Sequence, residues 1–296
     1  MSATRPQEPT EDAFRRMIIG LCAGAASEDG LAAAAEIAGL MGLEIEGLFI
    51  EDEAVLGLAA LPFLREIVAD SLASRPFQAT RLESEMRQAA GARHKALAQA
   101  ARRSRTTYRF QAVRGEIEAV VSRAAGATDI MVVLEPGDAA ERTSHAAITM
   151  RRAAMRSSAS VLYVPAPVRM RHGAIVAVVR PGADETDVLR LAARIAAASS
   201  NDLVALSAAV DDIDHRRIAE LSAALGLSTE RITVHTLAHD NPEALVQALQ
   251  SVEQRLVVLD RGALGLDDER ALMALAARLR VPILTLEPQL EHPAFK

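Results

Sequence analysis

Two short apolar runs, half a chain apart, constrain this fold more than any other feature of the sequence. They lie in the stretches DIMVVLEPG (Asp129 to Gly137) and RLVVLDRGALG (Arg255 to Gly265). Each run is too short for a helix and is followed at once by a carboxylate and a glycine loop. This is typical of a strand buried on both faces of a parallel sheet. Ligands in such sheets bind beyond the carboxyl ends of the strands, so the two loops are the first candidates for a binding site.

Strand-like and helical segments alternate around these runs in the order β-α-β-α-β-α-β-α-β, once in each half of the chain. The repeat is too long for a solenoid and indicates a duplicated domain. Right-handed crossovers then predict an α/β fold with two tandem doubly wound parallel-sheet domains, which are Rossmann-like. We expect a flexible tail at 1–14, a first domain at 15–166 with a helical insertion at about 51–104, a linker at 167–172 and a second domain at 173–296.

Side-chain spacing gives further local expectations. The strand from Leu43 to Ile50 alternates Glu44 and Glu46 with apolar residues, which predicts one exposed face near a sheet edge. Short helices are expected at Ala54–Ala60 and Leu64–Leu72. In the second half, helices are expected at Ile213–Leu225 and from the N-cap Asn241 to Val252.

Composition excludes several classes of protein. The net charge of −6 gives no positive field for nucleic acid or an anionic membrane. The single cysteine, Cys22, cannot form an internal disulfide and fits a reducing compartment. No apolar run approaches the roughly 20 residues that cross a bilayer, and the polar start from Met1 to Phe14 is unlike a signal peptide. We expect a cytoplasmic protein that binds no nucleic acid and does not insert into a membrane.

The opening of the first half reads MIIGLCAGAASEDGLAAAAEIAGLMGLEIEGLFIEDE, and the two halves close on DIMVVLEPG…SSASVLYVPA and RLVVLDRGALG…RLRVPILTLE. These stretches resemble universal stress proteins, and the resemblance covers nearly all of both halves. It implies a tandem, UspA-like universal stress protein with domains of the adenine nucleotide alpha-hydrolase type. Because members of that family commonly pair through their last strands, it also implies a homodimer.

The resemblance does not extend to the family's ATP motif. ATP-binding members carry an aspartate at the end of the first strand and G-x2-G-x9-G-[ST] after the fourth, where backbone and hydroxyl groups hold the phosphates. The aspartate falls at Cys22 in the first half and at Val179 or Arg180 in the second. Each loop keeps one glycine, Gly137 or Gly262. The remaining motif positions hold Leu134, Ala147 and Ile148 in the first half and Leu259, Leu272 and Met273 in the second, while the register through Gly262 and Gly265 gives Leu275 and Ala276.

Glu135 and Asp260 also place carboxylates near the expected phosphates, which is repulsive. The sequence therefore predicts no ATP binding in the family's usual manner and no cofactor. The alternative is an adenine nucleotide, ATP included, in an altered site with at most slow hydrolysis. In the second half this site would use Arg180 and Arg261 with the backbone of Gly262 and Gly265. Cys22 and Gly137 are the candidates in the first half.

Several polar residues invite a chemical role. A helix N-terminus facing Cys22 could lower its thiol pKa and make a redox site, but we favour a small buried hydrophobe. Ser144 and His145 are interpreted as helix capping and not as a catalytic pair. The histidines at 215, 235 and 239 have no cysteine nearby and predict no metal site. No residue is therefore predicted to be catalytic.

The arginines Arg151, Arg152 and Arg156 could meet an anion or an acidic partner, but we expect an exposed helix face with ion pairs. The segment from Glu51 to Ile67 (EDEAVLGLAALPFLREI) is rich in apolar residues for a loop. It could be a lid over the first cleft, an interface with a protein partner or a second copy, or a segment packed on its own sheet.

Three functions remain open. We favour a non-enzymatic, stress-related regulatory protein or scaffold whose nucleotide sites have decayed. The others are a nucleotide-binding module with an altered loop and a redox sensor through Cys22.

Overall fold

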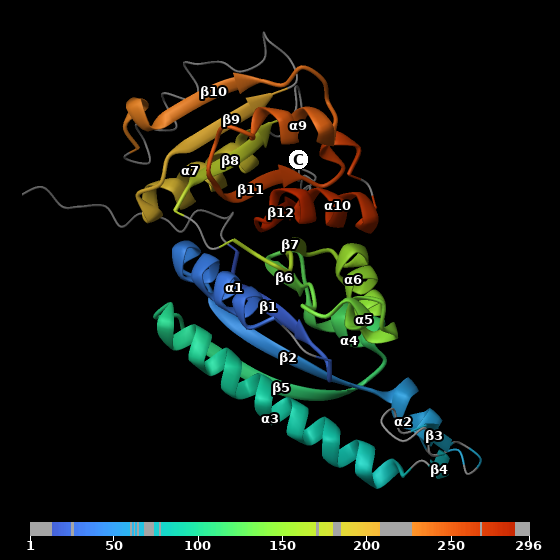
Figure 1. The fold of residues 1–296 in the computed structure, drawn as a ribbon. Coiled ribbons are helices and arrows are strands. Elements are labelled where there is room, and N and C mark those ends of the chain that lie inside the picture. Colours follow the sequence, from blue (N-terminus) through green and yellow to red (C-terminus); the bar gives the residue numbers. More distant parts are fainter. Residues whose placement is uncertain are drawn as a thin grey trace, which may run out of the picture.

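A computed structural model describes residues 14–24, 27–59, 61, 63, 65–67, 74–76, 78–169, 172–179, 185–207, 227–266 and 268–287. Ten strands in these ranges form one continuous sheet, and helices cover both of its faces (Figure 1). Residues 1–13 of the expected tail and the expected helix at Ile213–Leu225 lie outside the described residues.

The first half supplies five strands to this sheet: β1 (Arg16–Leu21), β2 (Glu44–Asp52), β5 (Tyr108–Gly115), β6 (Asp129–Leu134) and β7 (Ser160–Val164). Its helices are α1 (Glu28–Met41), α2 (Glu53–Ala59), α3 (Ala79–Arg103), α4 (Ile117–Ala124), α5 (Ala139–Arg142) and α6 (His145–Arg156). A separate two-stranded hairpin consists of β3 (Arg65–Ile67) and β4 (Ser74–Pro76).

The second half supplies the other five strands: β8 (Ala174–Val179), β9 (Leu203–Ser207), β10 (Ile232–Thr236), β11 (Gln254–Asp260) and β12 (Ile283–Leu286). Its α-helices are α7 (Glu185–Ser199), α9 (Pro242–Ala248) and α10 (Glu269–Leu279), with short 3-10 turns η1 (Thr229–Arg231) and η2 (Ala263–Gly265).

Both halves have the same topology. The sheet order is β10-β9-β8-β11-β12-β7-β6-β1-β2-β5, so each half reads third, second, first, fourth, fifth from its outer edge. All neighbours within a half are parallel. The predicted α/β fold class, with doubly wound parallel sheets, is confirmed.

The two sheets join through their last strands. β12 pairs with β7 antiparallel, with Leu284 opposite Leu162, Ile283 opposite Tyr163 and Thr285 opposite Val161. The strands therefore run in opposite directions in the two halves. As a result, the carboxyl ends of the two halves lie on opposite edges of the sheet.

Successive residues along each strand point alternately to the two faces of the sheet, and each face has its own hydrophobic core. Met17, Ile19 and Leu21 of β1 belong to the core that also contains residues of α1, α3 and α7, whereas Ile18 belongs to the core on the other face, with residues of α4, α6, α9 and α10. Both cores continue from one half into the other. Period-two alternation in strands buried on both faces explains why these strands read as unbroken apolar runs.

Capping residues fix the ends of several helices. Ser27 accepts a hydrogen bond from the N–H of Gly30 at the start of α1, and Asn241 does the same for Ala244 at the start of α9. α1 ends at Gly42, whose φ of 68° lies in the left-handed region that glycine adopts readily.

Three local expectations were wrong. Residues 65–67 form β3, within the range expected to be helical at 64–72. Glu46 is buried and pairs with Arg16, so β2, which is one strand in from the edge strand β5, does not expose it. The helix that begins after Asn241 ends at Ala248 and not at Val252.

Candidate functional site

The first half has a cleft at the carboxyl ends of β1 and β6, where doubly wound sheets bind ligands. It encloses about 60 Å³, whereas sites for drug-sized ligands measure roughly 300–1,000 Å³. Its walls come from the ends of β1 and β6, the loop after β6, α5 and the first turns of α6. Most of the lining side chains are apolar, among them Leu21, Val133, Leu134, Pro136 and Met150.

Methionine side chains limit the depth of this cleft. A Cβ atom added to Gly20 would lie 2.5 Å from Sδ of Met150 and 2.8 Å from Cε of Met131. A larger residue at this position of β1 would require these two flexible methionine side chains to move. Met150 both lines the cleft and packs in the core beneath it, so the space for a ligand is shallow.

The helix N-termini beside the cleft are already capped by their own side chains. Ser144 accepts a hydrogen bond from the N–H of Ala147 at 3.2 Å. Asp138 accepts hydrogen bonds from the N–H groups of Ala140 at 2.6 Å and Glu141 at 3.4 Å. A phosphate at a helix N-terminus uses these same donors. The expected capping role of Ser144 is confirmed, and three of the donors are occupied.

Carboxylates gather at this edge of the sheet. Glu141 lines the cleft, and Asp52 and Glu135 are buried at the ends of β2 and β6. Glu135 accepts a hydrogen bond from the N–H of Ala166 at 3.2 Å and lies 3.9 Å from the Nε of Arg142. Negative charge at this edge repels a phosphate.

Cys22 lies at the end of β1 and lines the cleft. Burial, and to a smaller extent the negative charge of Asp52, raise the pKa of its thiol to about 12. A thiol needs a lowered pKa to act as a nucleophile or redox group near neutral pH. The half-buried environment of Cys22 therefore favours the neutral thiol, which behaves as a small apolar side chain.

Arg261 of the second half makes hydrogen bonds to backbone carbonyl groups of the first half. Its guanidinium donates hydrogen bonds to the carbonyl oxygens of Met155 (3.1 Å), Ser157 (3.2 Å) and Ala159 (2.8 Å), and it pairs with Glu287. Because α6 ends at these residues, Arg261 places a cation at the C-terminus of a helix, which the helix dipole favours.

The glycines beside Arg261 have special backbone conformations. Gly262 (φ 81°) and Gly265 (φ 69°) lie in the left-handed region, and so does the buried Leu264 between them (φ 58°). Arg180 lies outside the described residues. The anion site at Arg180, Arg261 and these glycines therefore stays a prediction.

The strand pairing in the sheet aligns the loop after β6 with the loop after β11 differently from the sequence motif, by one residue. The N–H of Glu135 donates to the carbonyl of Val164, and the N–H of Arg261 donates to that of Leu286, at the corresponding end of the last strand. Arg261 in the second half is thus the structural equivalent of Glu135 in the first half. Gly137 and Gly262, aligned in the sequence, are one residue apart in the fold. No atom lies within 4 Å of a Cβ added to Gly137, so packing does not require glycine there.

α6 is also held by a partly buried ion pair between the halves. The Nε of Arg151 lies 2.7 Å from the Oε1 of Glu269 on α10, and the Arg151 side chain is 8% exposed. The expectation of an exposed arginine face was wrong for Arg151. It was correct for Arg156, which is exposed and lies 3.7 Å from Glu118.

Metal binding finds no support in the part of the chain that the structure describes. No three His, Cys, Asp or Glu side chains there lie close enough to hold an ion. His235 is exposed on β10, and His215 lies outside the described residues.

The segment at 51–67 exposes three large apolar side chains. Among the described residues, the large hydrophobic side chains left exposed are Leu58 (56%), Leu61 (37%) and Phe63 (75%). We call these three the apolar tip. Leu58 lies in the last turn of α2, and Leu61 and Phe63 follow that helix. α2 lies at the end of the molecule far from the second half (Figure 1). None of the three lines the first cleft, so this arrangement does not make them a lid.

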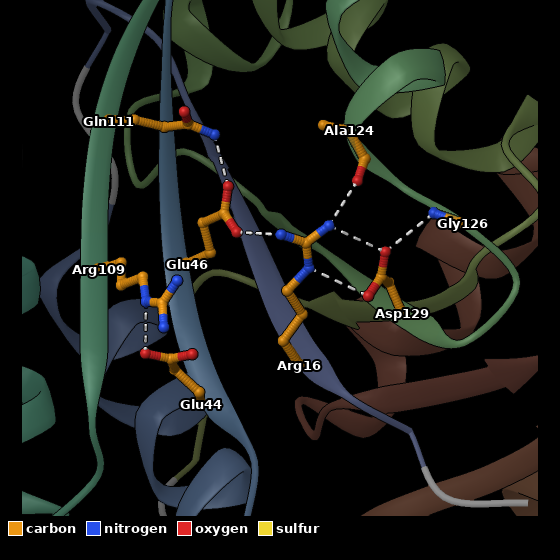
Figure 2. Close-up of polar contacts among 8 residues, drawn as sticks. All are labelled: Arg16, Glu44, Glu46, Arg109, Gln111, Ala124, Gly126 and Asp129. Carbon is orange, nitrogen blue, oxygen red and sulfur yellow. Dashed lines mark hydrogen bonds and ion pairs between the residues drawn. The ribbon is translucent and has the colours of Figure 1, made fainter.

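Sequence reasoning missed a polar network at the opposite edge of the first half. Figure 2 shows Arg16 of β1 between Asp129 of β6 and Glu46 of β2. Arg16 also donates to the carbonyl of Ala124, and Gln111 of β5 donates to Glu46. Every charge in this network has a partner, so it ties four strands together and leaves no group free for chemistry. Spacing gives no signal for it, because Arg16 and Asp129 lie 113 residues apart.

Comparison with known proteins supports the fold. No family model and no curated protein matches the chain. A universal stress protein from Archaeoglobus fulgidus is similar in structure, with 15% identity, a TM-score of 0.59, and 95% of this chain and 99% of that chain covered. A putative universal stress protein from Pseudomonas aeruginosa gives 15% identity, a TM-score of 0.51 and 94% coverage of both chains.

The chain therefore has the fold of a tandem universal stress protein, and the resemblance seen in the sequence is confirmed at that level. The cytoplasmic domain of a prokaryotic cation chloride cotransporter shares this architecture at 8% identity and a TM-score of 0.50, covering 92% of this chain and 94% of that domain. The same fold thus occurs in proteins of different kinds, and the function has to be argued from the sites. Among the described helices, none combines the length and apolarity needed to cross a membrane.

Proposed function

We propose that this chain is a non-enzymatic regulatory protein or scaffold of the universal stress type, cytoplasmic, that does not bind ATP in the family's usual manner. One observation carries the proposal. At the cleft of the first half, the lining includes the carboxylate of Glu141, and the N–H groups of Ala140 and Ala147 already donate hydrogen bonds to Asp138 and Ser144. Both features disfavour an anion.

Calorimetry and thermal unfolding with ATP, ADP, AMP and cyclic nucleotides, with and without magnesium, test this. A ligand at a hundred times its dissociation constant stabilises the native state by about 2.7 kcal/mol, so binding would be visible. We expect no shift with any of them. A saturable shift with ATP would overturn the proposal.

A second candidate is an adenine nucleotide site in the second half. The observation in its favour is the left-handed loop at Gly262 and Gly265, where a Cβ added to Gly265 would meet no atom within 4 Å. Such a loop lets a ligand approach the backbone closely. This candidate requires measurable nucleotide affinity that falls on Arg261→Ala.

Contact with a protein, either a partner or a second copy, would then work through the apolar tip of Leu58, Leu61 and Phe63. An exposed apolar patch commonly marks such a contact. The pairing of a homodimer through last strands is supported less, because β7 and β12 already pair with each other inside the chain. Sedimentation of the wild type and of Leu58→Ser/Phe63→Ser at micromolar concentration measures self-association. If the wild type and the variant are both monomers, the apolar tip does not mediate self-association, and its contact would be with a different protein.

A further inference from the structure

We propose that the outer edge of β5 binds an extended, acidic segment of another protein, which pairs with β5 as a further antiparallel strand of the sheet. This goes beyond the proposed function, because it assigns a contact surface separate from the apolar tip and states the chemistry of the partner. Two features of β5 carry it: the unpaired backbone of an edge strand and the excess of positive charge around that edge.

β5 lies at one end of the sheet, and among the described strands only β2 pairs with it. The carbonyl of Thr107 accepts a hydrogen bond from the N–H of Ile45 at 2.9 Å, which fixes the direction of the backbone groups. From Thr107 onward, every second residue bonds to β2, and the residues between point their N–H and C=O groups outward. The outward-pointing residues are Tyr108, Phe110, Ala112 and Arg114. Such unpaired groups are the template on which an added strand forms.

Positive charge surrounds this edge, although the chain as a whole is acidic. The stretch from Met86 to Gly115 covers most of α3 and all of β5. It holds eight of the chain's 33 lysines and arginines and none of its 39 aspartates and glutamates. α3 lies beside β5 (Figure 1). Arg109 and Arg114 of β5 pair with carboxylates of neighbouring elements. The other exposed cations, on α3 and the turn after it, keep the edge positive: Arg87, Lys95, Arg102, Arg103 and Arg105.

The charge selects an acidic segment over a second copy of this chain. Antiparallel pairing of two β5 strands about their centres would place Arg109 opposite Arg114, and like charges directly opposite each other destabilise a sheet. Charged side chains suppress self-pairing at sheet edges in this way. Glutamates opposite the two arginines would form favourable pairs instead. Nucleic acid would also meet the arginines, but it has no peptide groups to pair with the strand edge.

The test uses an acetylated and amidated octapeptide, TEVTVTET, whose glutamates lie opposite Arg114 and Arg109 when it pairs antiparallel with β5. Hydrogen exchange of isotope-labelled protein, followed by NMR, measures the outward N–H groups of Phe110 and Ala112. We expect saturating peptide to slow their exchange about tenfold or more, because strand pairing removes these groups from water. The N–H of Val234 in β10, at the other end of the sheet, should exchange at an unchanged rate.

Matched peptides separate strand pairing from attraction between charges. N-methylation of the fourth and sixth residues removes N–H groups that would donate to β5, so it should abolish binding. N-methylation of the third and fifth residues removes N–H groups on the far side of the peptide, so most of the binding should remain. The lysine peptide TKVTVTKT should bind about tenfold more weakly than TEVTVTET, or worse.

Three variants test the surface of the protein. Ala112→Pro removes an outward N–H, which an edge strand tolerates, and should abolish binding of TEVTVTET. Arg109→Glu combined with Arg114→Glu should weaken TEVTVTET binding about tenfold or more and should strengthen TKVTVTKT binding. The control Arg152→Glu reverses an exposed charge on α6 and should leave both affinities unchanged.

The absence of protection at Phe110 and Ala112 in millimolar TEVTVTET would overturn the proposal. So would equal binding of the glutamate and lysine peptides, or of the two N-methylated peptides. A single-stranded oligothymidylate that binds this edge more tightly than TEVTVTET would also overturn it and assign the surface to nucleic acid. These outcomes do not depend on the nucleotide titration or on the apolar tip, so this inference and the proposed function can fail separately.

Discussion

Leu162 of β7 and Leu284 of β12 lie directly opposite each other in the antiparallel pair that joins the two halves. The neighbouring pairs, Tyr163 with Ile283 and Val161 with Thr285, lie on either side of this pair and are related by a two-fold rotation. The pseudo-two-fold axis of the molecule therefore passes between the two leucines. Because each half uses its last strand here, both last strands are already paired within the chain.

Arg261→Ala tests the joint at the C-terminus of α6. The substitution removes the hydrogen bonds to three carbonyl groups and the pair with Glu287, so we expect a loss of about 2–4 kcal/mol in the free energy of unfolding. Urea unfolding measures it. The matched control is Arg278→Ala. The exposed side chain of Arg278 lies 3.5 Å from Glu243, and its removal should lower the free energy of unfolding by less than about 1 kcal/mol. Equal effects of the two would refute the structural role of Arg261.

Arg16→Met tests the network at the amino edge of the first half (Figure 2). It leaves Glu46 and Asp129 buried without their cation, and we expect a loss of about 3–5 kcal/mol. In Arg109→Met, the exposed pair with Glu44 at 2.9 Å is lost instead, with an expected effect below about 1 kcal/mol. Chemical denaturation of both variants compares them. The role of Arg16 is disproved by a difference of less than about 1 kcal/mol.

Arg151 and Glu269 give a third test, because they join α6 to α10 across the halves. Each of Arg151→Met and Glu269→Gln should destabilise the fold, Arg151→Met by about 3 kcal/mol or more because Glu269 loses its partner. A double-mutant cycle should show a coupling energy of about 1–3 kcal/mol. Additive effects would mean that the two side chains do not interact in solution.

Cys22 should react slowly with iodoacetamide in the native state. Its thiol pKa is raised from its ordinary value to about 12 by burial, and only the thiolate attacks. At pH 8 we expect a rate roughly a thousandfold below that of the urea-unfolded chain. Native and unfolded rates within tenfold of each other would show that the thiol is accessible and ionised.

The same shift gives a pH dependence of stability with a definite sign. Above a pH of about 8.5, the unfolded chain loses the thiol proton while the native state keeps it. Stability is therefore unaffected by Cys22 at neutral pH and falls as the pH rises from about 8.5 toward 12. Cys22→Ala should remove this part of the alkaline decline, which unfolding curves between pH 8 and 10.5 can detect.

Much of the fold could be predicted because its signals are local. Apolar runs such as Leu256 to Leu259 predict buried strands, and Gly42 and Asn241 mark helix ends through their own backbone and side-chain preferences. The prediction of secondary structure failed where the local spacing of apolar residues was short and ambiguous. The range at 64–72 has helical spacing, yet residues 65–67 pair with 74–76 as a hairpin.

The candidate site was less predictable, because its decisive contacts join distant residues. Arg261 was expected at an anion site, and only the fold shows that its guanidinium reaches α6 of the other half. Cys22 was placed correctly at a strand end, but its pKa depends on burial and on Asp52 of the neighbouring strand. Glu46 read as an exposed residue because its partner Arg16 lies on another strand.

The sequence by itself determined the α/β class and the repeat of one strand and helix order in both halves, since each depends on residue type and spacing along the chain. The tertiary structure alone decided that β7 and β12 join the halves into one sheet, and that Arg151 and Arg261 serve this joint. Pairing between strands and ion pairs across helices depend on distances in space, which spacing along the chain does not encode.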